Sequence, residues 1–111
     1  MKQYIESYTP ANAELPEKRF VKFGETDNIV TLATSPTDNI IGVTVRKPAN
    51  GSVDVGRLGQ ASVEFGGTVA RGQKVTCDSQ GRAVLAQTGD NIAAVAEHSS
   101  VLNDKDLVLV K

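Results

Sequence analysis

The chain has 111 residues, with 12 Lys and Arg against 13 Asp and Glu, one His, one Cys and no Trp. This length predicts a single domain with a modest core, and a net charge of −1 without runs of like charge argues against binding to nucleic acid. The lone Cys77 excludes an internal disulfide, and no apolar run approaches the length of a membrane span or a classical signal-peptide core, so we expect neither membrane attachment nor export by such a signal.

The first 18 residues show neither a helical nor a strand period, and they contain Pro10 and Pro16. We expect an extended N-terminal arm over 1–18, with strand character over 2–8 once a partner strand is present. Its apolar side chains are too few to offset the entropic cost of ordering it, so the arm alone is expected to be mobile and dispensable for folding. They are Tyr4, Ile5, Tyr8 and Leu15.

From Arg19 onward the chain consists of short runs rich in Val, Ile and Thr, each bounded by Gly, Pro, Asn or Asp. This pattern predicts an all-β domain over 19–111, a small barrel or sandwich of seven to nine short strands. An Ala-rich short helix over 90–100 is the one helical alternative. The expected strands are 19–23, 28–34, 40–46, 52–58, 61–65, 73–78, 82–87, 91–97 and 106–110.

The last of these runs, DLVLV at 106–110, is apolar at successive positions and therefore apolar on both faces of a strand. Such a strand is expected in the middle of a barrel or against another subunit. Leu107 and Leu109 are accordingly assigned to the core or to an oligomer interface, and the sequence leaves both assignments open.

One part of the chain resembles another. DNIIGVTV at 38–45 is echoed by DNIAAVAE at 90–97, and the ungapped match extends to 58 and 110 with five identities in 21 positions. A strand-rich chain produces such a match by chance about as readily as by duplication. If it is structural, it predicts two similar strand-turn-strand layers within one barrel.

Reactive side chains are too sparse to predict a catalytic, metal or cofactor site. His98 is the only His, and Cys77 lies within an apolar strand, so neither a nucleophile-base pair nor a zinc site is expected. Asp104 and Asp106 are read as the solvated start of a strand, and a small enzyme using them with His98 is the weaker alternative. A binding or structural role is therefore favoured over catalysis.

Residues 66–111 resemble the small β-barrel capsid cement, or head decoration, proteins of tailed bacteriophages and prophages. The resemblance rests on V-x-x-G-x-x-V at Val69 to Val75, D-x-x-G at Asp78 to Gly81, G-x-x-I-x-x-V at Gly89 to Val95, and the acidic-then-apolar end from Asp106. The upstream IIGVTV also looks like a strand of that family. The polar arm departs from the family pattern, in which the first strand usually starts with a longer apolar stretch.

This resemblance implies a non-enzymatic protein without cofactors that is made in the bacterial host cytoplasm and binds the outer surface of the phage head. There it would clamp joints between major capsid protein subunits, commonly as a homotrimer, without contacting nucleic acid or membrane. We expect the arm to add a strand to the capsid, with Tyr4, Ile5 and Tyr8 as capsid-binding residues. The alternative is a biotinyl or lipoyl carrier modified at Lys74, or another small β-barrel binding module.

Overall fold

The computed structural model describes residues 4–110, and within this range it contains nine β-strands and no helix. The predicted all-β class is thereby confirmed, whereas the alternative helix over 90–100 is wrong: this stretch holds the short strand β8 and a bend after it. The strands are β1 (Tyr4–Pro10), β2 (Phe20–Phe23), β3 (Ile29–Leu32), β4 (Ile40–Thr44), β5 (Val53–Glu64), β6 (Lys74–Cys77), β7 (Ala83–Leu85), β8 (Ala94–Ala96) and β9 (Lys105–Val110).

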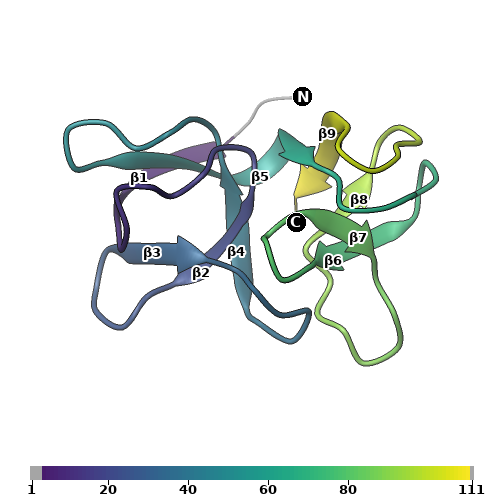
Figure 1. Ribbon diagram of the computed structural model, residues 1–111, viewed down its shortest axis with the longest axis horizontal. Helices are drawn as coiled ribbons and strands as arrows, with labels where there is room; N and C mark the ends of the chain where they lie inside the picture. The colour runs from purple at the N-terminus through teal and green to yellow at the C-terminus, as the bar shows by residue number, and fades with distance from the viewer. Residues whose placement is uncertain (1–3, 111) are drawn as a thin grey trace.

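Five strands close into a barrel in the order β1-β3-β2-β4-β5, because β1 pairs with β3 on one side and with β5 on the other. This barrel is the left half of the molecule in Figure 1. The β1–β3 seam is parallel and has only two paired positions, whereas β1 and β5 pair antiparallel over five. The barrel encloses a small core made of Tyr8, Leu15, Val21, Val30, Val53 and Val55.

Strand β5 belongs to both halves of the molecule (Figure 1). Its first part pairs with β1 and β4, and its second part, from Gly59 to Glu64, pairs with β9. The sequence predicted two strands here, separated at Gly59-Gln60. Gly59 has a φ of +85°, which an L side chain rarely adopts, and it redirects the strand without ending it.

The remaining strands continue the sheet in the order β5-β9-β8-β6-β7. A bridge between Phe65 and Ala83 brings β7 back to the end of β5, so this half curls around a core of its own. That core contains Phe20, Val63, Phe65, Val75 and Val108 among its fully buried side chains. The molecule thus consists of two β-halves, each wrapped around a separate apolar cluster.

Strands β2 and β4 lie between the two cores. Phe20 and Val43 contribute to the second core, whereas Val21 faces the first, and all three are almost completely buried. Burial on both faces explains why FV and IIGV do not alternate between apolar and polar residues. In β9, Val108 is buried within the chain, while Leu107 and Leu109 are only half-buried on the opposite face. Whether another subunit covers that face stays a prediction.

The N-terminal segment is not a free arm in this structure. Residues 4–10 are a strand of the closed barrel, Tyr8 is only 7% exposed and Leu15 is also buried. Few apolar side chains are enough here because Tyr8 and Leu15 enter a core that the other strands have already built, and β5 supplies the hydrogen-bonding partner. Whether 1–18 and 19–111 behave as separate folding units stays a prediction.

The sequence echo corresponds to two antiparallel hairpins, β4–β5 and β8–β9. Their loops, 45–52 and 97–104, occupy matching positions in the two repeats. The hairpins do not form two layers of one barrel as predicted, however. The first belongs to the five-stranded barrel and the second lies outside it, so each half of the molecule contains one copy.

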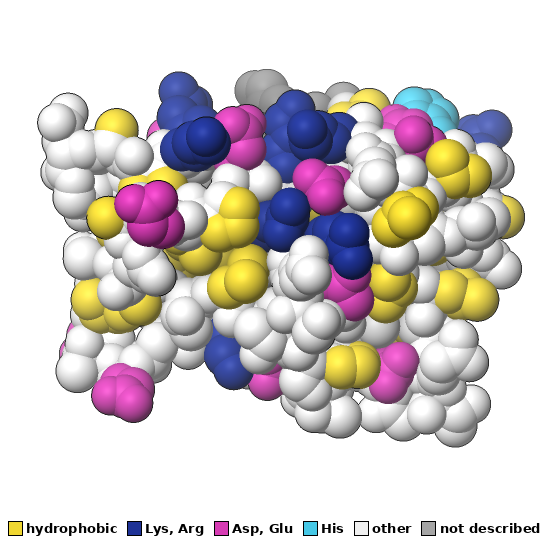
Figure 2. Space-filling model, viewed as in Figure 1, with side chains coloured by type: hydrophobic (Ala, Val, Ile, Leu, Met, Phe, Trp, Pro, Cys, Tyr) yellow, Lys and Arg dark blue, Asp and Glu magenta, His cyan; other side chains and the backbone are white. Residues whose placement is uncertain are grey.

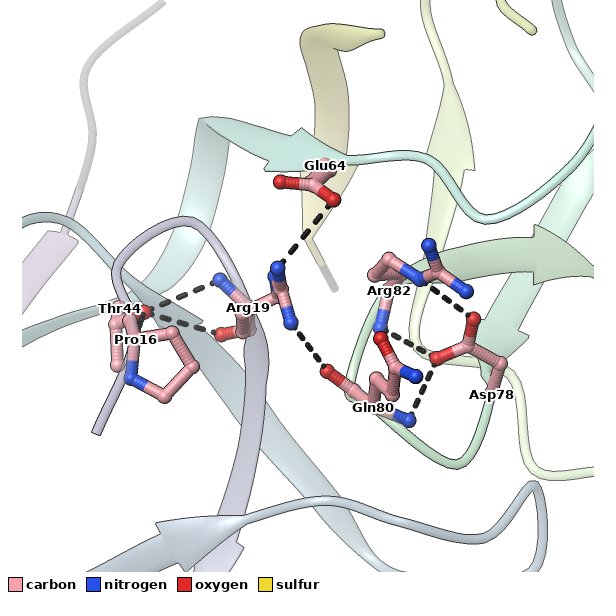
Figure 3. A network of polar contacts seen from close by, with 7 residues as sticks. All are labelled: Pro16, Arg19, Thr44, Glu64, Asp78, Gln80 and Arg82. Carbon is pink, nitrogen blue, oxygen red and sulfur yellow. Dashed lines mark hydrogen bonds and ion pairs between the residues drawn. The ribbon is translucent and has the colours of Figure 1, made fainter. Parts of the chain in front are cut away.

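Arg19 connects the two halves by polar contacts, and Thr44 holds the backbone beside it in place (Figure 3). The guanidinium of Arg19 contacts Glu64 at 3.3 Å and donates to the Gln80 carbonyl at 2.9 Å. The Thr44 hydroxyl is buried; it donates to the Pro16 carbonyl at 2.8 Å and accepts from the Arg19 backbone N–H at 3.1 Å. Thr44 therefore satisfies two backbone groups at the point where the N-terminal segment enters the barrel.

Replacing the Thr44 hydroxyl by a methyl group should destabilise the fold. Thr44→Val leaves the Pro16 carbonyl and the Arg19 N–H without their partner, and we expect a loss of about 1–3 kcal/mol in the free energy of unfolding. Urea denaturation followed by circular dichroism measures this loss. The matched control is Thr31→Val on β3, where the side chain is only half-buried; equal losses for the two variants would contradict the assignment.

Candidate functional site

Five of the eight large apolar side chains that are exposed in the described residues lie in two places. One is a hollow at the end of the barrel where β1 and β4 begin and β2 ends, which we call the mouth hollow. The other is the tip of the 97–104 loop, with Val101 and Leu102. Figure 2 shows hydrophobic side chains mixed with charged ones over both halves of the molecule. The mouth hollow is lined by Tyr4, Glu6, Phe23, Asn39, Ile40, Ile41, Arg57 and Leu58.

Arg57 organises the mouth hollow. Its Nη1 lies 3.3 Å from Glu6 Oε1 and 3.1 Å from the Tyr8 hydroxyl oxygen, and its guanidinium carbon lies 5.8 Å from the centre of the Phe23 ring. The Tyr8 and Phe23 rings meet edge to face at 6.0 Å. A hydrogen bond with Tyr4 and the charge of Arg57 hold the pKa of Glu6 below its ordinary value, so this acid stays ionised at neutral pH.

The three predicted arm residues occupy different settings. Tyr8 packs in the barrel core, so its ring is not available to a partner in this conformation. Tyr4, 52% exposed, forms one rim of the mouth hollow, whereas Ile5, 41% exposed, does not line it. Residues 4–8 pair with β5 along one edge, and within the described residues no strand pairs with their other edge.

The predicted core or interface pair lies on the outer face of β9. Leu107 and Leu109 stand opposite Ser62 and Gln60 of β5 and are half-buried. Sequence reasoning missed the mouth hollow, because Phe23, Arg57 and Leu58 come from strands whose order was unknown. The one local signal was Arg57 itself. It follows Val53 and Val55 at alternating positions of β5, so it faces the same side as these buried residues, and a charged side chain there indicates an opening of the barrel.

His98 and Asp106, considered for the enzyme alternative, do lie together. His98 Nδ1 is 2.7 Å from Asp106 Oδ1, while Asp106 Oδ2 accepts from the Ser100 hydroxyl at 3.2 Å. The His98 bond and the Leu107 backbone N–H lower the pKa of Asp106. Asp104 instead accepts from the Val101 backbone N–H at 2.9 Å, which shapes the loop. The pair thus anchors the two ends of the 97–104 loop at the surface.

This anchor predicts a pH dependence of stability. Asp106 has a folded pKa below its ordinary value of 3.8, so its ionised form stabilises the fold fully above that value, and the contribution is lost as the pH falls through the lowered pKa. We expect Asp106→Asn to be less stable than the wild type at pH 7 and the difference to shrink at acidic pH. Thermal unfolding from pH 7 to pH 2 measures both curves; a difference independent of pH would contradict the prediction.

The other reactive side chains have structural settings. Cys77 is fully buried, its thiol donates to the Ser35 carbonyl at 3.1 Å, and burial raises its pKa to about 11, so it is not a nucleophile at neutral pH. Lys74 is the first residue of β6 and not the tip of the 78–81 turn, where a carrier domain would place its modified lysine. Among residues 4–110, no group of three His, Cys, Asp or Glu side chains could hold a metal ion.

The segment that the structure covers has no helix long and apolar enough to cross a membrane. Comparison with curated proteins found no match. Among solved structures, the chain is similar to the head fiber gp8.5 N base of bacteriophage phi29, with a TM-score of 0.73, 15% sequence identity, and coverage of 99% of this chain and 95% of that one. At this identity the likeness shows a shared fold.

A family model described as phage cement protein matches residues 2–111, which is nearly the whole chain. The match includes β1, so the segment that looked atypical in the sequence is part of the family pattern. The family and the fold together support a structural role associated with the virion capsid. The chain belongs to the phage cement protein family.

Proposed function

We propose that this protein decorates the outer surface of a phage head, where it binds the major capsid protein and stabilises the joints between its subunits, without enzymatic activity. Family membership supports the proposal. A capsid joint is pulled apart by the packed genome, and a rigid plug that contacts several subunits strengthens it by multivalency. On this proposal the chain acts after its synthesis in the host cytoplasm and contacts neither nucleic acid nor membrane.

The observation that carries the proposal is the free edge of β1. No other strand among residues 4–110 pairs with one side of residues 4–8, and Tyr4 and Ile5 are the exposed apolar side chains of this strand. An extended capsid segment paired to this edge would gain backbone hydrogen bonds, with Ile5 packed against it. Tyr8 takes no part in this contact, because it holds the strand in place from inside the barrel.

Cosedimentation with capsids of the phage that encodes the chain tests this proposal. We expect wild-type protein to sediment with expanded capsids and to raise their resistance to heat. Ile5→Lys should weaken binding, because it places a charge beside the pairing edge. The matched control is Ile92→Lys, an exposed position in the second half of the molecule. Equal binding by wild type and Ile5→Lys would remove β1 from the contact, and no binding by the wild type would overturn the proposed function.

The proposal includes self-association as a homotrimer, in line with the family resemblance. Three linked copies bind a three-fold capsid site with the multivalency that a single weak contact lacks. The half-buried outer face of β9 with Leu107 and Leu109 is one candidate surface for this association. Light scattering at micromolar concentration tests it, and a monomer there would contradict the homotrimer.

A further inference from the structure

The two most exposed apolar features of the molecule are a hollow and the tip of a loop. The mouth hollow is concave and presents Phe23 and Leu58, each about half exposed, beside the half-buried Ile41. The 97–104 loop is a projection whose tip presents Val101 and Leu102, also about half exposed. Adjacent apolar side chains exposed to this degree on a small domain usually mark a contact surface.

The two features also offer polar groups that can pair. Arg57 already forms an ion pair with Glu6 inside the hollow, but its guanidinium keeps donors that this pair does not use. Arg57 uses Nη1 for Glu6 and Tyr8, and within the described residues Nε and Nη2 have no hydrogen-bond partner. Asp104, two residues after Leu102, uses Oδ2 for the Val101 N–H, while Oδ1 has no partner among residues 4–110. A carboxylate and a guanidinium with unused donors and acceptors match each other well.

The loop cannot reach the hollow within one copy. Leu58 lies in the middle of β5, whereas the Asn103 N–H donates to the carbonyl of Phe65, just beyond the end of β5. Seven residues of strand separate these points, which is roughly 20 Å at about 3.3 Å per residue. Any contact between the two features must therefore join different copies of the chain.

We propose that the tip of the 97–104 loop of one copy inserts into the mouth hollow of the next, with Leu102 packed against Phe23 and Leu58, and Asp104 paired with Arg57. This contact is head-to-tail, because it joins two different patches. Such contacts form closed rings when the rotation between copies allows it, and three copies make the trimer. The inference rests on the self-association included in the proposed function and gives it an interface. Ile5 does not line the hollow and remains available to a capsid.

A head-to-tail contact can be tested by mixing two defective variants. Leu102→Lys disables the projection and leaves the hollow intact, whereas Leu58→Lys disables the hollow and leaves the projection intact. Each variant alone should require a more than about tenfold higher concentration to assemble. Mixed in equal amounts, they should form dimers but no larger species, since only one of the possible contacts is intact. Sedimentation velocity resolves these species.

Three controls make the result decisive. Leu85→Lys, at another exposed apolar position, should assemble as the wild type does. Circular dichroism of both test variants should show wild-type unfolding temperatures, since the substituted side chains are exposed. A pair of single variants, Leu58→Cys and Leu102→Cys, should form a disulfide-linked dimer when mixed and oxidised, and the buried Cys77 does not compete.

The inference would be overturned if either lysine variant assembled like the wild type, or if the mixture of the two variants stayed monomeric. It would also be overturned if only Leu109→Lys lost assembly, because the interface would then lie on the outer face of β9. Capsid cosedimentation separates this inference from the proposed function. If folded monomeric variants still bind capsids at high concentration, the decoration function stands whichever interface joins the copies. If wild-type trimers do not bind capsids, the interface stands and the function fails.

Discussion

Deleting residues 1–15 should unfold the barrel half of the molecule. The deletion removes β1, which closes the barrel between β3 and β5, and it removes Tyr8 and Leu15 from a core of six buried side chains. Loss of a large core side chain typically costs about 2–5 kcal/mol, and the total stability of a domain is about 5–15 kcal/mol. We therefore expect no cooperative thermal transition near that of the full chain.

Circular dichroism and amide hydrogen exchange measure this effect, with loss of protection expected first in β3 and in the first part of β5. The matched substitutions are Tyr8→Ala, which should lower the unfolding temperature strongly, and Tyr4→Ala, which should leave it nearly unchanged because Tyr4 is exposed. A truncated protein with the unfolding temperature of the full chain would restore the sequence-based expectation of a dispensable arm.

Phe20→Ala should be one of the most damaging single substitutions, at about 3–5 kcal/mol. Phe20 lies on β2 of the barrel but is fully buried in the core of the second half, so its removal leaves a cavity where the two halves meet. Phe23, three residues later on the same strand, is half exposed, and Phe23→Ala should cost less than about 1 kcal/mol.

Chemical denaturation of the two variants gives the comparison directly. Both remove the same side chain from the same strand, so strand propensity and unfolded-state effects largely cancel between them. A cost for Phe20→Ala no greater than that for Phe23→Ala would show that the second core does not depend on β2. It would also undermine the description of β2 and β4 as buried on both faces.

The sequence predicted the strands well, because short-range chemistry determines them. Val, Ile and Thr runs ended by turn residues identified the segments of β2 to β9, with 52–58 and 61–65 merged into one strand. The local sequence does not show which faces of a strand are buried, because residues far away in the chain cover them. The sequences DLVLV and IIGV are similarly apolar, yet in the fold β4 lies between two cores and β9 does not.

The same limit applies to the site. Tyr4, Ile5 and Tyr8 were predicted from the sequence as capsid-binding residues of an N-terminal strand, but the burial of Tyr8 and the pairing of Tyr4 with Leu58 depend on the register of β1 against β5. The mouth hollow also needs Phe23 and Arg57, which come from other strands. No local pattern places these side chains together, because the barrel closes between strands far apart in sequence.

The shared strand β5 determines how the molecule would bear load. A force that draws the two halves apart along β5 acts parallel to the strand and perpendicular to its hydrogen bonds, so the ladders with β1, β4 and β9 are loaded in shear. Bonds sheared together must break together, whereas bonds pulled open at one end break in sequence. No flexible linker between the halves yields first, because the same strand crosses from one to the other at Gly59. If the protein clamps a capsid joint as proposed, it would transmit tension through its body, and the weakest point of the joint would lie at the contacts on its surface.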